Sequence, residues 1–140
     1  MECAKLVRMR ILPLAVLLFV STVYGQLTVT VSPPKGNGER VIIPLALKND
    51  LSKTVESARA VVFLLNDGKM VGQASRWVIG GGKDKPGLPS GGTNTFNFVV
   101  TTDRPFTTNL TARVSFLRVI LEHGKLADIA KDVQIQPATK

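Results

Sequence analysis

The residue types that carry out catalysis or hold metal ions are scarce in this 140-residue chain, which has one histidine, His123, and one cysteine, Cys3. Nucleophilic catalysis needs an activated serine, threonine or cysteine beside a base, and a zinc site needs three or four histidine, cysteine or carboxylate ligands. His123 lies in the polar segment Glu122-His123-Gly124-Lys125, which is typical of a tight turn, so we interpret it as an exposed turn residue. The sequence predicts no catalytic residue, no cofactor and no metal site, and we expect a protein that is not an enzyme.

The carboxylates do not change this interpretation. Most aspartates lie near predicted turns, where they cap backbone amides without any ion. A calcium site would require several loop ends to converge on one ion, and no spacing among the glutamates and aspartates singles out a pair for glycoside hydrolysis. The segment Gly80-Gly81-Gly82-Lys83 lacks the Gly-Lys-Ser/Thr ending of a phosphate-binding loop.

Trp77, the only tryptophan, is the best single candidate for a contact with a partner. It stands just before the segment from Gly80 to Asn94, which holds six of the chain's twelve glycines and predicts a long flexible loop. The alternative is a core or sheet-edge ring that lies under this loop. The predicted contact surface consists of Arg76, Trp77, Gly80, Gly81, Gly82, Lys83 and Lys85.

The elements that would position this surface are strands, because short runs of β-branched and aromatic residues alternate with glycine, proline and asparagine clusters. No segment has a convincing helical pattern. The predicted strands cover residues 27–31, 40–48, 55–65, 70–79, 94–101, 111–121 and 126–135. Seven short strands without crossover helices predict an all-β fold, an Ig-like antiparallel β-sandwich, with a closed barrel as the alternative.

Two further expectations concern single positions in these strands. Pro44 cannot donate to a ladder, which predicts an edge position or a bulge for its strand. The phenylalanines in the strand patterns, at positions 63, 96, 98 and 116, are expected in the core.

The first 25 residues have the three parts of a secretory signal peptide. A basic leader precedes an apolar run of ten residues from Ile11 to Val20, and Val23-Tyr24-Gly25 supplies a cleavage site. We predict cleavage before Gln26, with residues 1–25 as the signal peptide and 26–140 as one sandwich domain. The run is shorter than the ~20 residues that span a bilayer, so a permanent anchor is the weaker alternative. We expect a secreted or periplasmic product without a lipid anchor.

Cleavage would leave a basic domain without cysteine, which indicates stability from packing and favours a bacterial envelope or secreted protein. The formal charge is +8 for the whole chain. The first 25 residues contain three basic residues and one acidic residue, so +6 remains after cleavage. The lysines and arginines are scattered as single residues, which is typical of a solvated surface rather than a polyanion site. We expect no nucleic-acid partner, because the protein would leave the cytoplasm.

Several short motifs follow one another in a defined order. They are Leu47-Lys48-Asn49-Asp50, Lys53-Thr54-Val55, Ala58 to Leu65, Asp67-Gly68-Lys69-Met70-Val71-Gly72 and Leu88-Pro89-Ser90-Gly91-Gly92 before Phe96. This order resembles the FxLyD and cell-adhesion-related bacterial Ig-like domains, although Asn66 replaces the aromatic position of the naming motif. The segment Gly80 to Gly87 is also longer than the corresponding connection. The resemblance implies an Ig-like sandwich in an exported bacterial protein and no chemistry.

From these observations we expect an exported, non-catalytic Ig-like module that works by binding or assembly. A protein partner would contact the predicted surface around Trp77 or pair with an exposed edge strand. The alternative is a basic ligand-binding module for anionic polysaccharide or lipid headgroups.

Overall fold

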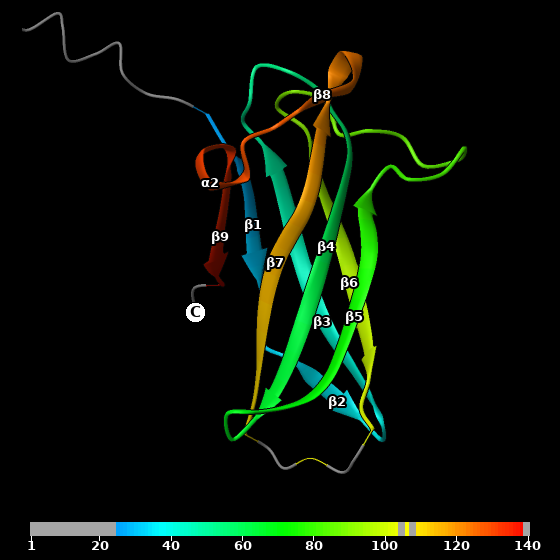
Figure 1. Ribbon diagram of the computed structural model, residues 1–140, viewed down its shortest axis with the longest axis vertical. Helices are drawn as coiled ribbons and strands as arrows, with labels where there is room; N and C mark the ends of the chain where they lie inside the picture. Colours follow the sequence, from blue (N-terminus) through cyan, green and yellow to red (C-terminus); the bar gives the residue numbers. More distant parts are fainter. Residues whose placement is uncertain (1–24, 104–105, 107–108, 139–140) are drawn as a thin grey trace, which may run out of the picture.

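The computed structural model describes residues 25–103, 106 and 109–138 (Figure 1). Except for Gly25, the predicted signal peptide lies outside the described residues. Within the described ranges, no helix is long and apolar enough to cross a membrane.

The chain folds into an all-β sandwich of two packed sheets, which confirms the predicted fold class. Sheet A contains β1 (Leu27–Val31), β2 (Lys35–Asn37), β3 (Arg40–Asn49), β6 (Thr93–Thr101) and β9 (Val133–Pro137). Sheet B contains β4 (Val55–Asn66), β5 (Lys69–Ile79), β7 (Leu110–Leu121) and β8 (Lys125–Leu126). In sheet A, β3 lies between β6 on one side and β1 and β2 on the other, and β9 lies outside β1. The order in sheet B is β5-β4-β7-β8.

The core lies between the sheets, because each central strand turns every second side chain inward. In β4, for example, Ala58, Ala60, Val62 and Leu64 are buried, whereas the residues between them are half-buried on the outer face. Sheet A contributes Leu27, Val29, Val41, Ile43, Leu45, Leu47, Phe98 and Val100. Phe98 and Phe116 are buried and Phe96 packs half-buried against the core, as expected. Phe63 differs, because it lies half-buried on the outer face of β4.

The carboxyl-terminal part departs from the predicted hairpin. A single strand was expected over 126–135, antiparallel to the preceding one. Instead the chain forms the 3-10 turn η3 (Glu122–Gly124), β8 and the one-turn helix α2 (Ile129–Asp132), and then β9 runs parallel to β1. Figure 1 shows β1 and β9 running in the same direction, opposite to β7. The Asp128 amide donates to the Asp132 carboxylate, and the Gln26 side-chain amide donates to the Lys131 carbonyl, which fixes α2 beside the start of β1.

Pro44 lies in a central strand, and the register between β3 and β6 continues through it without a shift, so the prediction of an edge position or a bulge was wrong. On one side of β3, β1 pairs from Leu45 onward and β2 pairs up to Ile42. The Pro44 carbonyl accepts the Ser32 amide on this side, and the N and C=O of one strand residue point the same way. The missing N–H therefore falls at the break between β1 and β2, where no ladder bond is lost.

Candidate functional site

In the described part of the chain, β7 has an unpaired edge along most of its length. β7 pairs with β4 along its whole length, but on its other side β8 pairs with only Ile120 and Leu121. The Val119 carbonyl also accepts the Ala127 amide. Among the described residues, the stretch from Leu110 to Arg118 therefore has a strand on one side only. Its outward backbone groups are available for pairing with another chain.

A groove runs beside this edge, because β9 joins sheet A instead of covering β7. The groove has a volume of about 460 Å³. We call it the seam groove, and it is lined by Val31, Ser32, Pro33, Pro34, Leu110, Thr111, Ala112, Arg113, Val114, Ile135, Gln136, Pro137 and Ala138. Most of this lining is apolar, and none of it is acidic. Among the residues that the structure describes, no segment fills the seam groove, which lies at a margin of the core.

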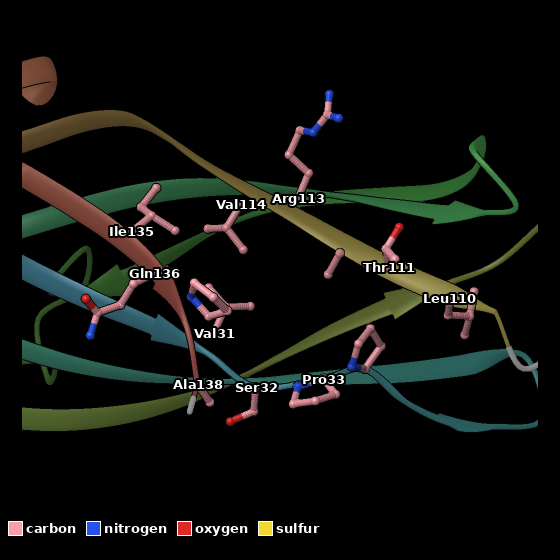
Figure 2. A pocket seen from close by; sticks show the side chains of 13 residues that line it. Val31, Ser32, Pro33, Leu110, Thr111, Arg113, Val114, Ile135, Gln136 and Ala138 are labelled. Atoms are coloured by element: carbon pink, nitrogen blue, oxygen red, sulfur yellow. The ribbon is translucent and has the colours of Figure 1, made fainter. Parts of the chain in front are cut away.

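The side chains around the seam groove divide into floor and rim. Figure 2 shows Val31, Val114 and Ile135 grouped around the groove, with the Arg113 guanidinium directed away from it. Val31, Leu110 and Ala112 pack half-buried against the core, whereas Ile135 is 39% exposed. We call Leu110, Ala112, Val114 and Ile135 the floor of the groove, and Arg113 and Arg118 on the outer face of β7 its rim. An apolar floor of this kind suits an extended segment with apolar side chains.

The opposite side of the sandwich, between β5 and β6, is closed. The Asp103 amide donates to the Val71 carbonyl over 3.2 Å, joining the end of β6 to β5. A Cβ on Gly72 would lie 3.0 Å from both the Thr101 carbonyl oxygen and Val100 Cγ1. The two sheets approach so closely here that only glycine fits without a shift of its neighbours.

The predicted contact surface is only partly brought together. Trp77 is half-buried on edge strand β5, and Gly81, with a φ of 87°, lies so close to its ring that a Cβ would overlap it. Gly80 also has a positive φ and abuts the Glu56 carbonyl. The ring therefore lies at the sheet edge under the loop, which is the alternative that the sequence left open.

The basic residues of that surface do not gather around Trp77, and of these only Lys85 lines the same hollow. Arg76 pairs with Ala60, a core position, whereas Trp77 pairs with the outward Arg59, so neighbouring Arg76 and Trp77 belong to opposite faces of β5. Lys85 and Trp77 both line a hollow of about 210 Å³. Gly82 and Lys83 are exposed and do not line it.

The loop between β5 and β6 is also less free than predicted, because its second half is held by backbone pairing. Leu88 forms two backbone hydrogen bonds with Val55 and is 5% exposed. Asn49 is buried, and its side-chain amide donates to the carbonyls of Lys53 and Leu88 while its oxygen accepts the Leu51 amide. The segment from Leu88 onward is therefore part of the packed structure rather than a flexible loop.

The outer face of sheet B carries a second distinctive cluster. Arg59 stands opposite Arg118 on β7, and Arg113 stands opposite Phe63. The Arg59 guanidinium lies 5.4 Å from the centre of the Trp77 ring, a cation–π distance. None of these three arginines forms an ion pair with a residue in the described ranges. This face is cationic with an apolar centre.

His123 occupies an exposed turn with a φ of 66°, as predicted. Its Nε2 lies 3.9 Å from a Glu122 carboxylate oxygen, and its backbone amide donates to Glu56. In the described part of the chain, no group of three or more histidine, cysteine or acidic residues could hold a metal ion.

Sequence reasoning missed the seam groove. The alternation of Leu110, Ala112 and Val114 indicates an inward face, but it carries no information about which strand would cover it. The decisive feature is the pairing of β9 with β1, a contact between the two ends of the domain that local periodicity does not encode.

Comparison with protein-family models and a search of the curated proteins returned no match for this chain. The likeness to FxLyD and related domains therefore stays a prediction from motifs. Two of those motifs have a defined structural role, because Asn49 binds the Leu88 carbonyl and the Gly92 amide donates to the Pro89 carbonyl.

Proposed function

We propose that this chain is an exported, non-catalytic Ig-like module that captures a protein partner along the seam groove and the unpaired edge of β7. The observation that carries the proposal is the coincidence of that edge with an apolar groove of about 460 Å³. Strand edges are templates for pairing, and apolar grooves beside them accept alternate side chains. The predicted signal peptide and the motif likeness support export and a bacterial envelope setting.

The seam groove is favoured over the predicted surface around Trp77. The hollow beside Trp77 is smaller, about 210 Å³, and Gly81 already packs on the ring. Arg76, on the opposite face of β5, does not contribute to that hollow. A partner at the seam would bury Ile135, which is otherwise exposed.

Photocrosslinking in the producing cells tests this proposal. A benzophenone amino acid is placed at Ile135 in the seam groove, at Lys83 in the predicted surface or at Met70, an exposed control on the far edge strand. We expect one defined protein adduct from position 135 and none from position 70. Adducts from position 83 alone would move the working surface to the loop, and equal labelling from all three positions would contradict capture at the seam.

A second candidate function is binding of anionic polysaccharide or lipid headgroups. It is favoured by the arginines on the outer face of sheet B, which form no ion pair within the described ranges. Retention of residues 26–140 on heparin measures it. Use of this face predicts retention that falls steeply with salt and is lost in Arg59→Ser/Arg118→Ser, whereas Lys83→Ser/Lys85→Ser, with the same charge change, retains it. Equal losses would indicate a non-specific effect of net charge.

A further inference from the structure

We infer that the segment captured at the seam is an extended strand that alternates apolar and acidic side chains and adds to sheet B beside β7. This inference rests on the proposed function and specifies the chemistry of its partner. It follows from the length of the unpaired edge, the direction of the side chains on either side of it and the sign of the charge at its rim.

The length of the edge determines the length of the segment. Nine residues, from Leu110 to Arg118, are unpaired on the outer side of β7 among the described residues. At ~3.3 Å per residue, this edge extends about 30 Å. An occupant of eight or nine residues in strand conformation would match this edge, and its part beside Leu110 to Val114 would lie over the seam groove.

The floor of the groove determines every second side chain of the segment. Leu110, Ala112 and Val114 turn inward from β7, and Ile135 pairs with Val29 on the inward face of sheet A. A strand added beside β7 would direct alternate side chains between the sheets, over this floor. Those side chains must be apolar, since the floor presents no charged group.

The rim determines the intervening side chains. Arg113 and Arg118 stand on the outer face of β7, neither has an ion-pair partner in the described part of the chain, and none of the groove-lining residues is acidic. A strand paired with β7 places its outward side chains beside these arginines, where opposite charges across a strand pair are favourable. Aspartate or glutamate at these positions complements the rim.

The same features argue against a second copy of this chain. Pairing β7 with the β7 of another copy would bring Arg113 and Arg118 of both copies onto one face, and like charges across strands are destabilising. Leu117 also has no partner in the β4 register, so β7 is irregular there. Charges and irregularities of this kind discourage self-pairing and leave an acidic segment free to bind.

A synthetic peptide tests the inference directly. The probe is a nine-residue peptide with valine at odd and glutamate at even positions, blocked at both ends and labelled with a fluorophore. We expect saturable binding to residues 26–140 by fluorescence anisotropy. Replacing every glutamate with lysine should weaken binding at least tenfold. Two N-methylated versions, at odd or at even amides, separate edge pairing from simple adhesion, since alternate amides face the protein. One version should bind and the other should not.

Matched variants locate the binding site. Ile135→Asp places a charge in the groove, and Met70→Asp makes the same change at an exposed residue outside it, since the two side chains are 39% and 53% exposed. Arg113→Glu reverses a rim charge, and Arg76→Glu reverses one on the far edge strand. We expect at least tenfold weaker binding for Ile135→Asp and threefold or more for Arg113→Glu. Both controls should stay within about twofold, and circular dichroism confirms folding of all four.

Each outcome bears on the inference. Loss of binding with one methylation pattern, together with loss in the groove variants only, supports it. No binding of the glutamate peptide, equal binding of the lysine peptide or equal effects of the control variants overturns it. If crosslinks from position 135 persist while the peptide fails, capture at the seam stands and only the acidic strand is excluded.

Discussion

The core of the sandwich has two margins where the edges of the sheets face each other, and these margins are closed to different extents. Between β5 and β6, the sheets approach until Gly72 touches Val100 and Thr101, and the connecting loop is held by Asn49 and Leu88. Between β7 and β9, the sheets diverge and leave the seam groove, because β9 pairs with β1. We call these the closed side and the open side. The difference shows that one core can be finished by packing at one margin and left open at the other.

The largest effect is expected from Asn49→Ala on the closed side. The substitution removes three hydrogen bonds and leaves the Leu88 and Lys53 carbonyls without that donor in a buried site. We expect a loss of about 3 to 4 kcal/mol in the free energy of unfolding, measured by urea denaturation. Asn97→Ala, at an exposed strand position, is the control and should change stability by less than about 0.5 kcal/mol. Equal effects would mean that the loop is not fastened by Asn49.

Leu88→Ala tests whether this loop belongs to the core. Leu88 is 5% exposed although it lies outside the named strands, whereas Leu117 is 56% exposed within β7. Truncating Leu88 should cost about 2 to 4 kcal/mol, and Leu117→Ala should cost less than about 0.5 kcal/mol. Thermal or urea unfolding measures both. The reverse order would contradict the assignment of the two sides.

Adding a methyl group at Gly72 tests how tightly the closed side is packed. Gly72→Ala would place its Cβ 3.0 Å from the Thr101 carbonyl oxygen, so we expect a destabilisation of about 1 to 2 kcal/mol. Urea denaturation at a constant m-value measures it. An unchanged midpoint would show that the sheets can separate at little cost here.

The smallest effect is expected from the corresponding enlargement at the open side. Ala112→Val extends a side chain that lines the seam groove and is only half-buried. We expect a change within about 0.5 kcal/mol, because the groove has space and valine favours strands. A loss as large as that of Gly72→Ala would remove the distinction between the two sides.

The sequence predicted the local elements well and their long-range partners poorly. The segments 27–31 and 55–65 were predicted as strands, and both form strands whose inward apolar side chains are buried, for example Leu27, Val29 and Val62. The break between the predicted strands 55–65 and 70–79 is the β4–β5 turn, where Asp67 and Gly68 adopt positive φ. By contrast, 126–135 reads as one strand, yet α2 interrupts it and β9 crosses to the other sheet. Periodicity reports which face of a strand is apolar, whereas the choice of neighbour depends on contacts over the whole chain.

The candidate site shows the same limit. Trp77 and the glycines were visible by residue type, but their mutual packing was not. The seam groove is lined mostly by ordinary apolar side chains, and their residue types give no sign of a groove. It becomes visible only from the topology, because no strand among the described residues pairs with the outer side of β7 from Leu110 to Arg118. An expectation of an exposed edge strand was available from the fold class, but not which strand it would be.

Amide hydrogen exchange along β7 tests the central claim most directly. Alternate N–H groups of an edge strand face outward, away from the paired strand. From Leu110 to Arg118, the outward amides should therefore exchange at least a hundredfold faster than the amides bonded to β4, with fast and slow amides alternating except at the irregularity around Leu117. In β4, which has a strand on both sides, neighbouring amides from Ala58 to Leu64 should be protected alike. Uniform protection along β7 would mean that its edge is covered, and the open side would not exist.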